Sequence, residues 1–276
     1  MDKKILTVQD ISCVGQCSLT VALPIISACG IETCILPSAV LSTHTGGFSG
    51  YTFRDLTDDM PLIARHWLKE GISFDALYTG YLGSEKQIDY VKDIQKSLIK
   101  KGGITIVDPA CADNGKLYYG FGEHFVKKMA SLIAVSDIAL PNITEASMLT
   151  GEEFKTEYDE SYVDRLTDKV LALGAKSIVL TGVSYDENST GVYVKTEAGE
   201  KYYYKHEKIS GGFHGTGDVY ASAFSGMLLH GKTIEEAARI AADFTLLAIK
   251  NTVGDENHRY GVKFEKSLGF LFNSLG

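Results

Sequence analysis

The chain has 276 residues, of which 45% are hydrophobic, and a formal net charge of −8 at pH 7. A chain of this length and composition can bury a large core. The negative charge argues against a nucleic-acid partner, because nucleic-acid binding needs a basic face. No run reaches the roughly eighteen consecutive apolar residues of a membrane span, so we expect neither a nucleic acid nor a membrane as a partner.

Two further features indicate where the protein resides. Residues 1–9 contain a short apolar stretch that ends in polar residues, which predicts a strand and not a signal peptide. The five cysteines are odd in number and lie mostly in apolar segments, a pattern typical of reduced thiols. We therefore expect a cytoplasmic protein.

The pattern of elements is an alternation of strands and helices. Short apolar runs rich in β-branched residues predict strands at 5–9, 32–37, 76–80, 104–108, 138–141 and 177–181. Amphipathic stretches between them predict helices at 19–29, 58–70, 86–101, 123–134 and 162–173. A hairpin (191–195 and 201–206) and three helices (217–229, 234–251 and 264–273) follow. The alternation predicts an α/β fold with a mostly parallel sheet, and the lack of a linker or repeat predicts one domain over residues 1–276.

Polar or glycine-rich residues follow several of these strands. Ligands of open α/β sheets bind beyond the carboxyl ends of the strands. The predicted strand ends place Asp108, Asn142 and Glu145 on one rim, with Thr181 and Gly182 after the next strand. Oxygen ligands of this kind could hold hydrated Mg²⁺ against a nucleotide phosphate.

The glycine-rich segment 211–218 leads directly into an apolar helix. Such a turn presents free backbone N–H groups at the positive end of a helix dipole, which is a site for an anion such as phosphate. Asp218 would repel an anion that is only bound there, but it is useful if it takes a proton from an attacking hydroxyl. The alternative is that Asp218 caps its helix, and the local residues leave both interpretations open.

A second glycine-rich segment, residues 226–233, matches the P-loop pattern but lacks the strand that must precede it. We interpret Gly231 as the residue that ends one helix and Thr233 as the start of a capping box for the next. The histidines show no spacing typical of a zinc site, although His44 and His214 lie in glycine-rich loops.

Several motifs together resemble a known family. Gly215-Thr216-Gly217-Asp218, Pro141-Asn142-x-x-Glu145 and Asp108-Pro109 resemble motifs of the ribokinase superfamily. Residues 42–45 (Ser-Thr-His-Thr) and 80–84 (Gly-Tyr-Leu-Gly-Ser) resemble segments of its pyridoxal kinases. The resemblance implies a ribokinase-like three-layer α/β/α fold with C-terminal helices. It also implies ATP-dependent phosphorylation of the 5′-hydroxymethyl group of a vitamin B6 vitamer: pyridoxal, pyridoxamine or pyridoxine.

The same resemblance implies roles for individual residues. Asp218 would be the general base, and Gly215, Thr216 and Gly217 would form the anion hole. The substrate would be bound by Asp10, His44, Thr45 and Tyr81 together with Asp218. ATP would be bound by Asp108, Asn142, Thr181, Gly182 and Phe213, with Gly215 and Gly217, and Mg²⁺ by Asp108 and Glu145. Family members are usually homodimers, many are aided by K⁺, and residues 113–118 match a mobile segment that shields the site.

Two departures from the family concern ring specificity. Asp10 stands where many pyridoxal kinases have a serine, and it is similar to the Ser-Asp region of hydroxymethylpyrimidine kinases. Residues 110–112 (Ala-Cys-Ala) replace the usual Val-Met-Gly. The alternatives are therefore a hydroxymethylpyrimidine (phosphomethylpyrimidine) kinase of thiamine biosynthesis and, from another class, a non-catalytic B6-binding protein.

Overall fold

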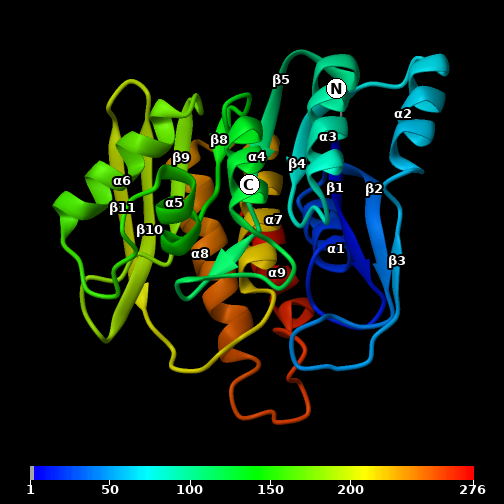
Figure 1. Cartoon of the computed structure of the whole chain (residues 1–276). Coiled ribbons are helices and arrows are strands. Elements are labelled where there is room, and N and C mark those ends of the chain that lie inside the picture. The colour runs from blue at the N-terminus through cyan, green and yellow to red at the C-terminus, as the bar shows by residue number, and fades with distance from the viewer. Residues whose placement is uncertain (1–2) are drawn as a thin grey trace.

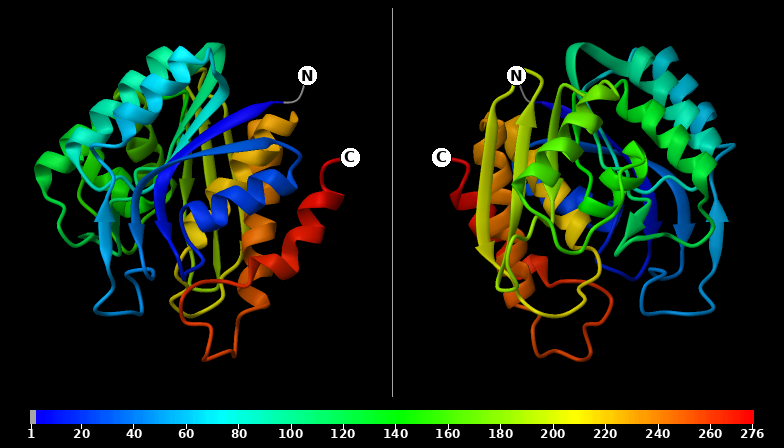
Figure 2. Two further views of the ribbon diagram at one scale, coloured as in Figure 1. Left: turned by 90° about the vertical axis from the view of Figure 1, so that its right-hand side faces the viewer. Right: turned by 60° about the vertical axis from the view of Figure 1, so that its left-hand side comes forward.

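A computed structural model describes residues 3–276, which form a large sheet between two layers of helices (Figures 1 and 2). The strands are β1 (Lys4–Ser12), β2 (Glu32–Leu41), β3 (Phe53–Asp55), β4 (Phe74–Thr79), β5 (Ile99–Val107), β6 (Ala112–Asp113), β7 (Lys116–Leu117), β8 (Ile138–Ala139), β9 (Ser177–Thr181), β10 (Ser189–Thr196) and β11 (Lys201–Glu207). The α-helices are α1 (Leu19–Ala28), α2 (Met60–Lys69), α3 (Glu85–Leu98), α4 (Glu123–Ile133), α5 (Ile143–Thr150), α6 (Glu160–Ala172), α7 (Thr216–His230), α8 (Ile234–Lys250) and α9 (Leu268–Asn273). A short 3₁₀ helix, Phe264–Ser267, precedes α9.

The main sheet has nine strands in the order β11-β10-β9-β8-β5-β4-β1-β2-β3. The six strands from β9 to β2 pair in parallel. The antiparallel hairpin β10–β11 extends one edge, and the short antiparallel strand β3 extends the other. The expected mostly parallel α/β/α architecture is therefore confirmed.

Alternate side chains of β1 pack against different helix layers, one on each face of the sheet. On β1, Leu6 and Val8 join the core beneath α2–α6, whereas Ile5 joins the core beneath α1, α7 and α8. A sheet with apolar residues on both faces requires a helix layer on each face, which is why the strands read as continuous apolar runs.

The expected elements are present, and some of their ends differ. The helix expected at 86–101 ends at Leu98, because Ile99 already pairs with Phe74 and begins β5. Three small elements were not expected: β3, the β6–β7 pair and α5. Helix α5 is buried on nearly all sides, so it lacks the amphipathic pattern that would have predicted it.

The structure confirms the interpretation of residues 226–233, the segment that matches the P-loop pattern. Gly226 lies inside α7, and Gly231 ends that helix with φ 114°. Thr233 and Glu236 form a reciprocal capping box at the start of α8. These residues therefore connect two helices and do not cradle phosphate.

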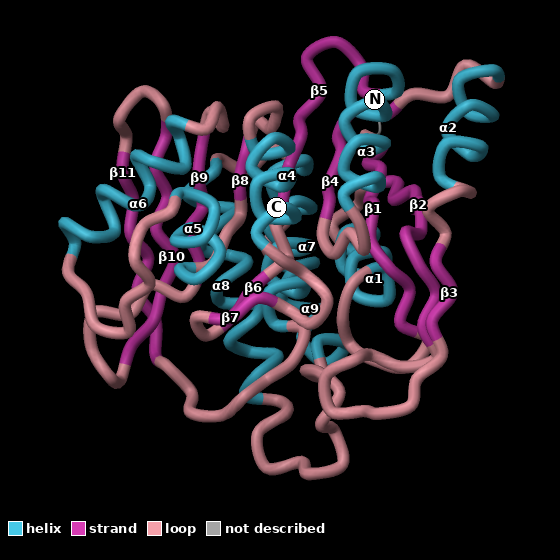
Figure 3. Tube along the Cα trace, viewed as in Figure 1, coloured by secondary structure: helices cyan, strands magenta, loops and turns pink. Residues whose placement is uncertain are grey.

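The long loops gather at the carboxyl ends of the parallel strands, the lower end of the view in Figure 3. They include residues 42–52, 208–215 and 251–263, which are far apart in the sequence. The five cysteines form no disulfide. Within residues 3–276, no helix is both long and apolar enough to cross a membrane.

Candidate active site

A cavity of about 870 Å³ opens at the carboxyl ends of the central strands. All the residues that the sequence singled out for substrate, nucleotide, metal or catalysis line it: Asp10, His44, Thr45, Tyr81, Asp108, Asn142, Glu145, Thr181, Gly182, Phe213, Gly215, Thr216, Gly217 and Asp218. The fold thus brings together residues from opposite ends of the chain, as the strand-end argument requires.

The glycine-rich turn begins α7. Gly215 is the N-cap residue, with φ 74°, and a Cβ atom there would lie 1.8 Å from the backbone O of Gln16. Only glycine fits this close approach. No side chain caps the first turn of α7, so its backbone N–H groups remain available for an anion.

Asp218 lies in this first turn, three residues after the N-cap. Its carboxyl group faces the backbone N–H of Ser18, from the segment before α1, as well as the first turn of its own helix. Burial raises the pKa of the Asp218 carboxyl to about 7, the Ser18 backbone N–H opposes this shift, and the Asp10 carboxylate adds to it. A carboxyl group with a pKa near 7 is suited to accept and return a proton at neutral pH.

Asp10 is buried at the end of β1 between two serine hydroxyls. Ser18 Oγ donates to one carboxylate oxygen at 2.6 Å, and Ser12 Oγ donates to the other at 3.0 Å. Burial raises the pKa of Asp10, whereas these two hydrogen bonds and the nearby His44 lower it. The two hydroxyls fix the orientation of the carboxylate in the cavity wall.

Two histidine rings flank Gly46 in the cavity lining. The ring centroids of His44 and His214 lie 5.5 Å apart, and a Cβ on Gly46 would lie 2.7–2.8 Å from atoms of both rings. The backbone N–H of Gly46 donates to Nδ1 of His44 at 3.2 Å. Burial and, to a smaller extent, the nearby His214 lower the pKa of His44, which favours a neutral ring.

The Tyr81 ring is held by an aromatic stack. It stacks on Phe121 with a centroid distance of 5.5 Å, and Phe121 stacks on Phe125 of α4 at 3.8 Å. The stack connects the loop after β4 to the segment after β7. That segment carries Tyr118 and the fully exposed Tyr119, which also line the cavity.

Glu145 and Asn142 form a capping box at the start of α5. Glu145 Oε2 accepts the backbone N–H of Asn142 at 2.9 Å, and its Oε1 accepts the N–H of Cys111 at 2.9 Å. Burial nevertheless raises the pKa of Glu145 to about 7. Burial also raises the pKa of Asp108 well above its usual range, with further contributions from the carboxylates of Glu145 and Asp218.

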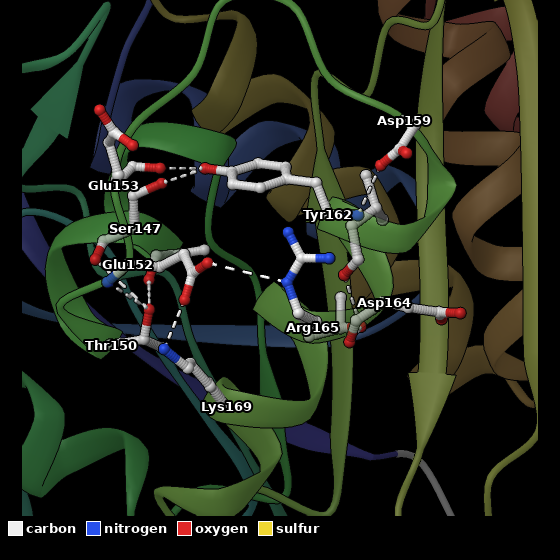
Figure 4. Close-up of polar contacts among 12 residues, drawn as sticks. Ser147, Thr150, Glu152, Glu153, Asp159, Tyr162, Asp164, Arg165 and Lys169 are labelled. Atoms are coloured by element: carbon white, nitrogen blue, oxygen red, sulfur yellow. Dashed lines mark hydrogen bonds and ion pairs between the residues drawn. The ribbon is translucent and has the colours of Figure 1, made fainter.

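Contacts with α6 hold the far end of α5 in place (Figure 4). The buried Ser147 Oγ lies 3.0 Å from the hydroxyl of Tyr162, which donates to the backbone O of Glu153 at 2.8 Å. Glu152, just after α5, pairs with Lys169 of α6. These contacts fix the helix whose first turn presents Asn142 and Glu145 to the cavity.

The cavity wall is rich in carboxyl groups. Its lining includes the carboxylates of Asp10, Asp108, Asp113, Glu145 and Asp218, and no Lys or Arg of residues 3–276. In the same part of the chain, no three His, Cys, Asp or Glu side chains are grouped to hold a metal ion alone. Carboxylate oxygens are a ligand type that Mg²⁺ takes, with water or phosphate oxygens completing its shell.

Some lining residues were not expected from the sequence. Ser12 and Ser18 carry no motif, although a serine near a strand-end aspartate is a weak signal for a hydrogen-bonded pair. Thr245, Leu246 and Ile249 come from the cavity-facing side of α8, and His206 comes from β11. An amphipathic pattern predicts which face of a helix is turned inward. It does not show which part of that face packs in the core and which part lines a cavity.

Known proteins resemble this chain over most of its length. The family model described as phosphomethylpyrimidine kinase matches residues 27–262. A "putative pyridoxal kinase" of Caenorhabditis elegans is 29% identical over 65% of the chain, and the match spans 57% of that protein's length. Other sequence relatives are named hydroxymethylpyrimidine/phosphomethylpyrimidine kinases.

Solved structures share the fold. A "putative phosphomethylpyrimidine kinase" from Bacteroides thetaiotaomicron, crystallised with pyridoxal, superposes with a TM-score of 0.93 at 37% identity, over 98% of this chain and 96% of that one. Pyridoxal kinase from Lactobacillus plantarum gives a TM-score of 0.90 at 29% identity, over 98% and 97% of the two chains. The chain therefore belongs to the phosphomethylpyrimidine kinase family and has the ribokinase-like fold of its pyridoxal kinase neighbours.

Proposed function

We propose that this kinase transfers the γ-phosphoryl group of ATP to the 5′-hydroxymethyl group of a vitamin B6 vitamer. The observation that carries the proposal is the position of Asp218. Its carboxyl group, with a pKa of about 7, lies in the first turn of α7 directly after the glycine-rich turn. This arrangement puts a proton acceptor beside a set of N–H donors, which is what the attack of a hydroxyl on a phosphoryl group needs.

In this mechanism, Asp218 removes the proton of the hydroxymethyl group as its oxygen attacks phosphorus. The backbone N–H groups at Gly215, Thr216 and Gly217 stabilise the charge on the transferring phosphoryl group. Thr181, Gly182 and Phe213 would bind the nucleotide, and Asn142, which Thr181 joins through a backbone bridge, would face its phosphates. The capping box holds Asn142 in this place.

Mg²⁺ with ATP is part of the proposal. Asp108 and Glu145 are the residues that would hold it, partly through water, since three backbone N–H groups already occupy the Glu145 carboxylate. When bound, the ion would neutralise phosphate charge in a cavity lined by carboxylates. We also propose activation by K⁺ and a homodimer, which assays with and without K⁺ and sedimentation would test.

The choice of a B6 vitamer as the substrate is supported by the residues proposed to contact its ring. Asp10, His44, Thr45 and Tyr81 line the cavity, and the related Bacteroides protein was crystallised with pyridoxal. A specific observation favours the second candidate, hydroxymethylpyrimidine (phosphomethylpyrimidine) kinase. The buried Asp10 carboxylate is fixed by two hydroxyls and could bind the amino group of an aminopyrimidine.

The experiment is a measurement of ATP consumption with Mg²⁺ and K⁺ against pyridoxal, pyridoxamine, pyridoxine and hydroxymethylpyrimidine, for the wild type and Asp218→Asn. We expect turnover of the B6 vitamers that the variant loses. Preference for the pyrimidine would replace the first candidate with the second. Tight vitamer binding without turnover of any substrate would instead indicate a non-catalytic B6-binding protein.

A further inference from the structure

The chain turns away from the sheet at the carboxyl end of β9. Residues 182–184, which we call the β9 turn, begin the connection from β9 to β10, and Gly182 has φ 73°, in the left-handed region. Thr181 and Gly182 line the cavity, where we propose that they bind the nucleotide. The position of the β9 turn therefore decides where this part of the cavity wall lies.

The hydroxyl of Tyr158 bonds both ends of the β9 turn. Tyr158 lies in the loop between α5 and α6 and does not line the cavity. Its hydroxyl accepts the backbone N–H of Ser184 at 2.9 Å and donates to the backbone O of Gly182 at 3.3 Å. A hydroxyl can accept and donate at the same time, whereas phenylalanine would fill the same space and make neither bond.

The middle residue of the β9 turn is bonded by a second tyrosine. Tyr203 lies on β11, the edge strand beside β10, and its hydroxyl donates to the backbone O of Val183 at 3.2 Å. The N–H of Val183 donates to the backbone O of Gly191 at 3.0 Å. Two elements that are far apart in the sequence thus bond the same three residues.

The rings of both tyrosines pack against Tyr185, which directly follows the β9 turn. Tyr185 lies edge-on to both rings, with centroid distances of 6.1 Å to Tyr158 and 5.2 Å to Tyr203. Edge-to-face contacts of this kind stabilise one arrangement of the rings. Burial raises the pKa of both Tyr158 and Tyr203, so each phenol is neutral and keeps the proton that it donates.

We propose that the hydroxyls of Tyr158 and Tyr203 hold the β9 turn in the position that binds the nucleotide. Both are positioning residues, since neither lines the cavity. A binding segment that is already held in place loses less conformational entropy when its ligand binds, so the affinity is higher. The residues proposed to contact the substrate ring lie on other elements, and the two hydroxyls should therefore affect nucleotide binding and not vitamer binding.

The nucleotide role rests on the proposed kinase function, whereas the hold on the β9 turn does not. The experiment compares the wild type, Tyr158→Phe and Tyr203→Phe as full chains. Calorimetric titration with ADP and Mg²⁺, and separately with pyridoxal, gives the two Kd values, and steady-state assays give kcat and both KM values. Hydrogen exchange of peptides that cover residues 182–184 reports on the turn itself.

Tyr193→Phe is the matched control. Tyr193 also loses one hydroxyl bond, the one that it donates to Asp164 at 2.8 Å. Its ring lies 6.5 Å from that of Tyr203, but its hydroxyl does not bond the β9 turn and it does not line the cavity. Thermal melts show whether the variants are equally folded.

We expect the Kd for ADP and the KM for ATP to rise about three- to tenfold in Tyr158→Phe, which loses two hydrogen bonds, and less in Tyr203→Phe, which loses one. The Kd and KM for pyridoxal should stay at the wild-type values, and the turn should exchange faster. Equal ADP affinity in Tyr158→Phe and Tyr193→Phe would overturn the proposal, even with faster exchange at the turn. So would equal losses of ADP and pyridoxal affinity in Tyr158→Phe. A wild type that bound pyridoxal but no ADP would instead refute the proposed kinase function, and the nucleotide role with it.

Discussion

The hydroxyl of Ser18 donates a 2.6 Å hydrogen bond to the carboxylate of Asp10, eight residues before it in the chain. Ser18 itself has an unusual backbone conformation, with φ 51°, and its N–H faces Asp218. Ser18 thus connects Asp10, which we propose contacts the substrate ring, to the proposed base, Asp218. Asp10 is therefore the residue to replace in a test of the proposed substrate.

Replacing Asp10 by serine should change vitamer preference. The variant loses a buried negative charge that favours an amine, so we expect the ratio of kcat/KM for pyridoxamine over pyridoxal to fall by about tenfold. Competition assays with both vitamers in one mixture would measure the ratio directly. An unchanged ratio would show that Asp10 does not contact the substituent that differs between the two.

The activity should depend on pH through Asp218. Its pKa is raised to about 7, and only the ionised carboxylate can take the hydroxyl proton. We therefore expect kcat/KM to fall as pH decreases through about 7. The Asp218→Asn variant should be on the order of 10²–10⁴-fold slower and lack this acid limb. Pyridoxine lacks an aldehyde, so a limb that appears with pyridoxal but not with pyridoxine would belong to the substrate.

The same carboxyl should lower stability at alkaline pH. Its folded-state pKa of about 7 is above the ordinary value of 3.8, so the folded state holds the proton more tightly than the unfolded state. Stability from this group is therefore complete below about pH 4 and is lost as pH rises through 7. We expect Asp218→Asn to raise Tm by a few degrees at pH 8 and to have little effect at pH 4, as measured by calorimetry. A lower Tm for the variant at pH 8 would contradict this.

Glu145→Gln should affect both stability and metal use. In the wild type, two backbone N–H groups donate to the two carboxylate oxygens of Glu145, and the amide of the variant would point an N–H donor at one of them. The loss of this hydrogen bond should lower the free energy of unfolding by about 1–3 kcal/mol. A higher Mg²⁺ requirement should accompany this loss if Glu145 faces the metal.

Glu236→Gln is the matched control, because Glu236 closes the equivalent capping box on α8 and does not line the cavity. The control should lose stability and keep the wild-type Mg²⁺ titration. If the two variants titrate alike, Glu145 has a structural role only.

Gly46→Ala should weaken substrate binding. The added methyl group would meet the rings of His44 and His214, and overpacking of this kind usually costs about 1–3 kcal/mol. We expect a rise of about tenfold in KM for the vitamer. Gly269→Ala, in open space on α9, should leave KM unchanged. A normal KM in Gly46→Ala would mean that the histidine pair moves apart without affecting the substrate.

Much of the fold could be predicted because its signals are local. The βα alternation, the capping box at Thr233 and the end of α7 at Gly231 depend on neighbouring residues, and the structure has each of them. Helix α5 could not be predicted in this way, since it is buried nearly all round and shows no apolar stripe. The β6–β7 pair consists of two-residue strands, too short for a periodic pattern.

Short motifs in the sequence were enough to suggest the chemistry proposed for the site. The sequence placed Asp218 after a glycine-rich turn, and Asp10, Asp108 and Asn142 after strands whose carboxyl ends must share one edge. The tertiary structure decided which of these groups meet, for example that Glu145 bonds the backbone of Cys111, 34 residues away. It also decided the pKa of Asp218 and the hydrogen bonds from Tyr158 and Tyr203 to the β9 turn. The reason is physical: propensities and caps act within a few residues, whereas burial and long-range hydrogen bonds exist only once the layers have packed.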